Sequence, residues 1–397
     1  MWFLILLAAV YLAVNFFLWH RVIRLLKNIH GFFGNKWIMI VFTLLYLFFL
    51  NSIWIWVIFD DPIWTAFFKY INNVWIGIFI YALIFVAAAE IVTFILWAFK
   101  KMRKGYDGYR RYIVMRGTAV VLLVISFSLY GVFHYQNIKV NNYEIDIDKS
   151  SHAGDSMRIV LVADTHLGYS VGNDMMSEMV DLINRQKPDL VVFAGDIVDN
   201  DYYAVSDAEK TAETLSRINS KYGVYGCYGN HDVKETLIGG FTVSLDEEAK
   251  IPPEVEEFVQ RAGIKILQDE SETVAGDIIL LGRYDASKPN SSSGKRASID
   301  QLTEDLDRKK LIICIDHQPS QLQEKASAGV DLDLCGHTHD GQIFPGNITI
   351  NFFWDNPYGL LKVGDMYSIV TSGVGVWGPA MRVGTDSEIA VIDIDLR

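Results

Sequence analysis

The sequence predicts an α/β domain with mixed sheets, preceded by an all-α domain of four transmembrane helices. Residues 1–139 hold long apolar runs rich in Trp and Phe, whereas residues 140–397 alternate strand-like runs with helical patterns. Such alternation is typical of α/β folds. Charge divides at the same place, since residues 1–139 carry a net charge of +9 and the remainder −21, against −12 for the whole chain. We therefore expect two domains, at 1–137 and 138–397.

Four apolar stretches approach or exceed the roughly 20 residues that a membrane span needs. They are 2–19, 37–59, 74–99 and 112–133. No positively charged segment precedes the first stretch, so we interpret it as a retained helix and not a cleaved signal peptide. The connections after the first and third stretches carry most of the Lys and Arg. The positive-inside rule then predicts a multi-pass protein of the cell membrane with its second domain extracytoplasmic.

One acidic residue, Glu90, lies inside the third apolar stretch. Charge within a bilayer is costly, so such a residue is a functional candidate by default. The alternative is a hydrogen-bonded Glu that packs against another span, near Asn51 and Ser52.

A strand predicted at 138–147 follows the fourth span with no long linker, so we expect the second domain to lie close to the membrane surface. Helices are predicted at 173–186, 206–219, 253–262, 298–309 and 320–328. Strands are predicted at 159–163, 190–194, 224–228, 264–267, 278–281, 311–315, 330–335, 367–371 and 388–394. The polar segment 287–296 is expected to form a mobile loop.

Five of these strands are each followed by side chains that can bind metal. The residues are Asp164-Thr165-His166, Gly195-Asp196, Gly229-Asn230-His231-Asp232, Asp316-His317 and Gly336-His337-Thr338-His339. Carboxylate and imidazole ligands together favour Mn²⁺, Fe or Zn²⁺. The three cysteines lie in apolar runs without a close CxxC pair, which argues against a disulfide framework or a zinc–cysteine site.

These motifs, in this order, resemble the calcineurin-like metallophosphoesterase family and its membrane-anchored bacterial branch. The resemblance implies a four-layer αββα sandwich with mixed sheets and two divalent metal ions, with Mn²⁺ favoured over Zn²⁺ or Fe. Ala163 departs from the family, which often has Ser at this position, but it is not a ligand.

The resemblance also implies a role for each residue of the site. Asp164, His166 and His339 would hold the first metal, Asn230, His317 and His337 the second, and Asp196 would bridge both. His231 would protonate the leaving oxygen, a contribution of about 10²–10⁴-fold, and Asp199 would orient His231. A hydroxide between the metals would attack phosphorus in line.

Other polar residues near these motifs leave two interpretations open. Asp232 and Asp316 could support the ligands or cap helices, and for Asp232 we favour the cap. Four further residues could touch substrate or simply lie on the surface: Arg283, Tyr284, Trp377 and Arg382.

The predicted function is hydrolysis of a phosphomonoester, phosphodiester or pyrophosphate bond, favouring a lipid-linked substrate because the anchor keeps the domain near the bilayer. The acidic domain argues against nucleic acid as a partner. One alternative is a four-span sensor or transporter with a regulatory phosphoesterase domain, for which Glu90 is the only support. Another is a binding module that retains metals without turnover. The oligomeric state stays open.

Overall fold

The computed structural model describes residues 2–55, 62–99, 108–152, 154–235, 237–238, 241–242, 250–288 and 294–397. The chain divides into two compact units, Met1–Val132 and Phe133–Arg397.

The first unit is built from four long helices. They are α1 Trp2–Ile29, α2 Lys36–Ile55, α3 Pro62–Ala98 and α4 Tyr109–His134, with a short 3-10 turn, η1 Gly31–Gly34. All four are long and apolar enough to cross a membrane. The end of the expected second span, at 56–59, and the basic residues at 100–104 lie outside the described residues.

Two of these helices extend beyond the stretches that hydropathy predicts. α1 continues past Arg21 and Arg24 to Ile29. α3 begins at Pro62, so residues 62–73 are helical where we expect a connection. Proline is favoured in the first turn of a helix, where its missing N–H is not needed. Charged and polar residues can continue a helix after its apolar stretch has ended, and hydropathy does not detect this.

Glu90 is paired with two arginines of neighbouring helices. Its carboxylate oxygens lie 3.0 Å from Arg21 Nη2 of α1 and 3.0 Å from Arg116 Nη1 of α4. Asn51 and Ser52, the partners considered from the sequence, bond instead to carbonyls of their own helix, α2. The ion pairs give a structural reason for an acidic residue in an apolar helix.

The second unit contains two six-stranded mixed sheets. The first has the order β1-β14-β2-β3-β4-β7, with bounds Ile138–Ile147, Ser387–Leu396, Ser156–Val162, Leu190–Ala194, Val224–Cys227 and Lys265–Ile266. The second has the order β12-β13-β11-β10-β9-β8, with bounds Gly359–Val363, Met366–Val370, Leu332–Cys335, Ile312–Ile315, Ile278–Gly282 and Glu270–Val274. A two-stranded ribbon joins β5 Leu237–Ile238 to β6 Phe241–Thr242.

The two large sheets face one another across the main hydrophobic core. Ile159, Leu161 and Val192 of the first sheet belong to the same buried cluster as Ile313 and Leu334 of the second. The central strands β3, β9 and β10 are apolar and buried along their length, as expected where a sheet is covered on both faces.

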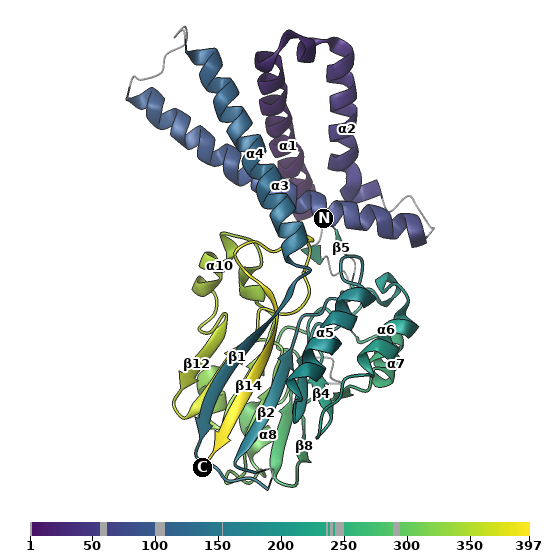
Figure 1. The fold of residues 1–397 in the computed structure, drawn as a ribbon, viewed down its shortest axis with the longest axis vertical. Coiled ribbons are helices and arrows are strands. Elements are labelled where there is room, and N and C mark those ends of the chain that lie inside the picture. The colour runs from purple at the N-terminus through teal and green to yellow at the C-terminus, as the bar shows by residue number, and fades with distance from the viewer. Residues whose placement is uncertain are drawn as a thin grey trace. The chain divides into compact units, whose positions relative to one another are not determined.

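Helices cover the outer faces of the sandwich (Figure 1). α5 Asn173–Gln186, α6 Ala208–Leu215 and α7 Pro253–Arg261 lie on the side of the first sheet, and α8 Ile299–Thr303 and α9 Leu322–Ser327 on that of the second. The remaining short helices are η3 Tyr202–Ala204, η4 His339–Gly341, α10 Gly346–Thr349 and η5 Ile350–Phe352. The expected α/β fold with mixed sheets is confirmed. Within the expected loop 287–296, residues 289–293 lie outside the described residues.

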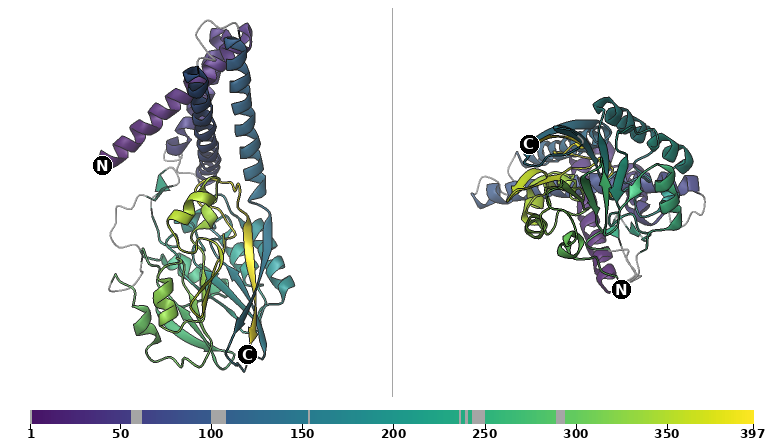
Figure 2. Two further views of the ribbon diagram at one scale, coloured as in Figure 1. Left: turned by 90° about the vertical axis from the view of Figure 1, so that its left-hand side faces the viewer. Right: turned by 90° about the horizontal axis from the view of Figure 1, so that it is seen from below.

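Strand directions define one end of the first sheet that matters for the site. β1 runs parallel to β14, with Ile138 opposite Ser387, and β14 runs antiparallel to β2, with Ala390 opposite Leu161. The starts of β1 and β14 and the end of β2 therefore lie together (Figures 1 and 2). Asp164 lies two residues after the end of β2, so the candidate ligands lie at this end.

Candidate metal centre

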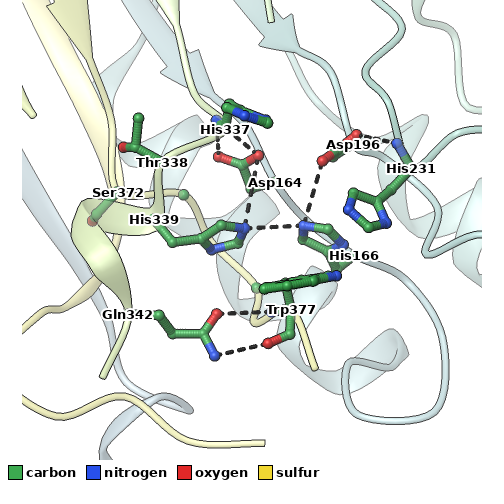
Figure 3. A network of polar contacts seen from close by, with 12 residues as sticks. Asp164, His166, Asp196, His231, His337, Thr338, His339, Gln342, Ser372 and Trp377 are labelled. Atoms are coloured by element: carbon green, nitrogen blue, oxygen red, sulfur yellow. Dashed lines mark hydrogen bonds and ion pairs between the residues drawn. The ribbon is translucent and has the colours of Figure 1, made fainter. Parts of the chain in front are cut away.

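The ends of five strands bring together all seven residues that the sequence assigns to metal binding. β2 leads to Asp164 and His166, β3 to Asp196, β4 to Asn230, β10 to His317, and β11 to His337 and His339. Parallel strands end at the same edge of a sheet, and side chains on the loops that follow can converge there. Figure 3 shows Asp164, His166, Asp196, His337 and His339 of this set, with His231 beside them.

One group of donor atoms comes from Asp164, His166 and His339, each offering an atom within 4.8 Å of the others. His166 Nε2 lies 3.0 Å from His339 Nε2, which is 4.0 Å from Asp164 Oδ1. Two imidazole nitrogens that point at one another need a cation or a proton between them, so this group has the arrangement of a metal site.

A second group comes from Asp196, His317 and His337, again within 4.8 Å of one another. His317 Nε2 lies 3.1 Å from Asp196 Oδ2, 3.1 Å from His337 Nδ1 and 3.1 Å from Asn230 Oδ1. The amide oxygen of Asn230 therefore joins the two imidazoles and the carboxylate.

Asp196 contributes to both groups through one oxygen atom. Its Oδ2 is 3.1 Å from His317 Nε2 of the second group and 3.6 Å from His166 Nε2 of the first. Its Oδ1 accepts a hydrogen bond of 2.7 Å from the backbone N–H of His231. A carboxylate oxygen shared in this way is what a pair of closely spaced metal ions requires.

The charge balance of the site fits bound cations. Asp164 and Asp196 are buried, and among the described residues their ion pairs within 4.0 Å are with histidines alone. Burial raises the pKa of Asp164 to about 6. Buried carboxylates without a cationic partner are costly, so two divalent ions would satisfy this pair.

The histidines differ in how readily they become neutral ligands. Burial lowers the pKa of His337 to about 3, and burial with the nearby His166 lowers the pKa of His339 well below its ordinary value. Burial also opposes charge on His317, but Asp196 outweighs it and raises the pKa of His317 well above its ordinary value. Metal binding requires neutral imidazole, so a metal at the second group would displace the proton that Asp196 favours on His317.

The backbone around the site is strained. Five of the seven residues have positive φ: Asp164 at 52°, His166 at 43°, Asp196 at 52°, His337 at 74° and His339 at 51°. Residues other than glycine adopt this region at a cost of about 1–3 kcal/mol each, and such residues cluster at functional sites. The motifs give no sign of this strain, which the surrounding sheets must hold in place.

Two motif glycines are required by close approach. A Cβ on Gly229 would lie 2.2 Å from Asp196 Oδ1, and one on Gly336 would lie 2.5 Å from Asp164 Oδ2 and 2.4 Å from the Ala163 Cβ. Any side chain at either position would displace a carboxylate of the site.

The expected pair of His231 and Asp199 has a third member. His231 Nδ1 forms a short hydrogen bond with the Asn200 side-chain oxygen, whereas Asp199 Oδ1 is 3.7 Å away. Asp199 Oδ1 lies closer to His166 Nδ1, at 3.3 Å. Asn200, which sequence reasoning missed, is thus the residue bonded directly to His231, whereas Asp199 lies closer to His166, a candidate ligand.

The sequence between the first and last of these strands matches a known family. Residues 157–341 match the family model described as calcineurin-like phosphoesterase. This part of the chain belongs to the calcineurin-like phosphoesterase family. The resemblance to this family and the expected class of enzyme, a metallophosphoesterase, are confirmed at the level of the family.

Three relatives of this phosphoesterase domain cover different shares of the chain. A transmembrane protein with a metallophosphoesterase domain from Danio rerio is 30% identical over 295 residues, which are 70% of this chain and 62% of that protein. An uncharacterized metallophosphoesterase of Aquifex aeolicus is 27% identical over 282 residues, 69% of this chain and 98% of its own. One of Campylobacter jejuni is 28% identical over 336 residues, 82% of this chain and 83% of its own. The match thus spans less than two thirds of the Danio rerio protein.

Asp232 of the phosphoesterase domain is not a helix cap, so that expectation is wrong. Its Oδ1 accepts hydrogen bonds from the backbone N–H groups of Ile197 and Val198, and its Oδ2 from that of Gly229. Asp232 therefore connects the loop after β3 to the loop after β4. Its role is set by these three buried N–H groups and not by the tendency of Asp to cap a following helix. Asp316 is likewise held by Arg296 and Lys325, at 3.1 and 3.0 Å.

Two arginines considered as surface or substrate residues are buried in the phosphoesterase domain. Arg283 donates hydrogen bonds to Gln321 Oε1 and the Ala297 carbonyl. Arg382 donates to the carbonyls of Ser372, Gly373, Gly375 and His339. Its Nη2 also lies 3.2 Å from His339 Nδ1, so Arg382 positions a ligand. Trp377 lies beside the site, with its ring 5.8 Å from that of His231 (Figure 3).

Proposed function

We propose that this chain is a membrane-anchored phosphoesterase that uses two divalent metal ions, Mn²⁺ foremost. Its reaction is the hydrolysis of a phosphomonoester, phosphodiester or pyrophosphate bond in a lipid-linked substrate on the extracytoplasmic side of the membrane. The observation that carries the proposal is Asp196, whose Oδ2 atom lies within 3.6 Å of both groups of imidazoles.

The residues of the chain supply binding, orientation and proton transfer. Bound divalent ions would lower the pKa of water and neutralise charge on the phosphoryl oxygens. His231 lies beside Trp377 with a small exposed fraction of 8%, so it can reach a substrate that covers the site. With Nδ1 bonded to Asn200, the other ring nitrogen of His231 is the one that would protonate the leaving oxygen.

A lipid-linked substrate is favoured by the way the domain is tethered. β1 begins at Ile138, and only three residues separate it from the last residue of α4, His134. We expect a tether this short to keep the metal centre near the bilayer. The net charge of −21 over residues 140–397 disfavours free anions in solution, whereas a lipid-linked phosphoester is already concentrated at the surface.

The test uses the full chain in detergent–lipid micelles, stripped of metal by a chelator and reloaded with Mn²⁺, Zn²⁺ or Fe²⁺. Matched pairs of esters that share a headgroup but differ in their acyl chains separate substrate class from bond type. We expect hydrolysis only with metal, and faster hydrolysis of the acylated member. Asp196→Asn should abolish both activities while leaving the chain folded. Much faster hydrolysis of a water-soluble nucleotide would contradict the lipid-linked substrate, and no hydrolysis by the metal-loaded chain would contradict the function.

The structure offers less support for a sensor or transporter. Glu90, the residue on which that alternative depends, has both carboxylate oxygens paired with arginines, at 3.0 Å each. The metal centre, by contrast, contains the buried carboxylates of Asp164 and Asp196, whose negative charge bound cations would neutralise.

A further inference from the structure

An uncharged aromatic segment projects from the phosphoesterase domain. We call residues 344–353, which include α10 and η5, the aromatic segment. Its apolar side chains are unusually exposed: Phe344 41%, Ile348 54%, Phe352 81% and Phe353 77%. None of residues 341–354 is charged, although the domain as a whole is strongly acidic. Exposed apolar patches of this kind mark interaction sites.

Hydrogen bonds hold the aromatic segment at the end of the domain that follows the last membrane helix in the chain. Phe344 N–H donates to the Val383 carbonyl at 2.8 Å, and Asn347 Nδ2 donates to the Gly384 carbonyl at 3.3 Å. Two residues further on, Asp386 pairs with Lys139 at 2.9 Å and with His134 at 2.7 Å. The segment therefore lies beside the start of β1, the strand that follows the last membrane helix (Figure 1).

The same segment borders the metal centre. At its N-terminal side, Gln342 exchanges hydrogen bonds of 2.8 and 2.9 Å with the backbone of Trp377, whose ring lies beside that of His231 (Figure 3). At its C-terminal side, the ring of Trp354 lies 5.3 Å from that of His337. The exposed phenylalanines and the metal-binding side chains thus belong to one end of the domain.

We propose that the aromatic segment inserts Ile348, Phe352 and Phe353 into the surface of the bilayer and so holds the metal centre against the lipid. A bilayer is the favoured occupant because the tether of three residues keeps this end within reach of it and because the segment lacks the charges that pair with an acidic or basic protein surface. Apolar side chains of interfacial elements enter about 5–10 Å into the headgroup boundary. The purpose of this docking rests on the proposed function: it would present lipid-linked phosphoesters to the metal centre.

The decisive experiment measures the depth of a single label in the full chain. The three native cysteines are buried, so a fluorescent label can be attached selectively to Phe352→Cys. Asp148→Cys, exposed beyond the far end of β1, is the matched control. The proteins are reconstituted into phosphatidylcholine–phosphatidylglycerol vesicles, with and without nitroxide-labelled lipid. We expect quenching by the lipid nitroxide at 352, with shielding from aqueous iodide, and the reverse at 148.

Two outcomes would overturn the proposal. Free quenching of the 352 label by iodide would mean that the segment lies in water. Protection from iodide without quenching by the nitroxide would mean that protein covers the segment, either a second copy of the chain or another part of it. Phe353→Cys serves as a second position should the first variant fail to fold.

A second measurement connects docking with turnover. In Phe352→Ser/Phe353→Ser, hydrolysis of a soluble phosphoester should be unchanged, while hydrolysis of its acylated counterpart in vesicles should fall by about tenfold or more, given the apolar area lost. Equal loss on both substrates would count against docking. If the unmodified chain hydrolyses no lipid ester at all, the proposed function fails while the depth measurement still decides the membrane contact.

Discussion

Asp196 is the residue that joins the two groups of candidate ligands. Its Oδ2 faces imidazoles of both sets, and its Oδ1 accepts the His231 backbone N–H. Burial opposes its ionisation, but His317 and His231 hold its pKa well below the ordinary value of a carboxyl group. Asp196 is therefore charged at neutral pH, as a metal ligand would have to be.

His231 lies beside this centre without belonging to either set of ligands. We predict that His231→Ala lowers kcat by about 10²–10⁴-fold, because the leaving oxygen loses its proton donor. Metal content should stay near two ions per chain, measured by elemental analysis of the purified protein. A variant with full activity would remove His231 from the reaction, and one that had lost its metal would show that His231 is itself a ligand.

Variants of Asp199 and Asn200 should have different effects, the first on metal affinity and the second on turnover. We expect Asp199→Asn to weaken metal affinity by about 10–100-fold, the usual cost of losing a carboxylate partner of a ligand histidine, because Asp199 lies 3.3 Å from His166 Nδ1. Asn200→Ala should instead lower turnover with metal affinity unchanged, because Asn200 bonds to His231. Metal titrations and steady-state kinetics of both variants check this. The opposite pattern would restore Asp199 as the residue that orients His231.

The sequence could predict the residues of the candidate metal centre because their types and spacing follow strand ends. It could not predict Asn200, since a lone Asn after a strand is ordinary turn chemistry. It also misjudged Arg382 and Asp232, whose partners lie far away along the chain: Arg382 reaches His339 and Asp232 reaches Ile197. Contacts of this kind depend on how the loops fold over one another, which local patterns do not encode.

Among the elements, α9 is attached to the second sheet by a buried ion cluster. Lys325 Nζ lies 2.7 Å from Asp333 Oδ1 of β11 and 3.0 Å from Asp316 Oδ2, with all three side chains fully buried. Asp316 in turn precedes His317. The cluster therefore couples the packing of α9 to the position of His317, a candidate ligand.

Lys325→Met should be severely destabilising because it leaves two buried carboxylates without their shared cation. Breaking a buried ion pair costs about 3–5 kcal/mol, which corresponds to a fall of roughly 10 °C in Tm for a domain of this size. The exposed Lys362 of β12 provides the matched control, since Lys362→Met should change stability by less than about 0.5 kcal/mol. Thermal unfolding of the full chain in detergent measures both, and equal Tm values would refute the role of Lys325.

Prediction of the elements succeeded where the hydrophobic pattern was strong. α5 occupies 173–186 as expected, because its apolar residues recur with helical spacing and face the sheet. α8 is shorter than the expected 298–309, ending at Thr303. β8 and β12 were missed because edge strands bury little and carry mixed polar residues. α10 and η5 were missed because their apolar side chains face outward, which no burial pattern signals.

At the scale of the whole molecule, the main prediction is the side of the membrane on which the phosphoesterase domain lies. Only the distribution of Lys and Arg in the connections between spans supports it. Asp148→Cys should react with a membrane-impermeant maleimide in intact cells, because the positive-inside rule places the phosphoesterase domain outside. Lys27→Cys, exposed in the last turn of α1, should react only after permeabilisation. The buried native cysteines give little background. The reverse pattern of labelling would place the metal centre in the cytoplasm.

β14 has a consequence for biosynthesis. In the sheet, β14 lies between β1 and β2, so the first strand of the domain pairs with its last strand and not with the second. Until residues 387–396 have been synthesised, β1 lacks the strand with which it pairs in this sheet. β1 can therefore join the first sheet only once the segment that forms β14 has been made, so we expect the end of the sheet beside which the candidate ligands lie to be completed late in folding.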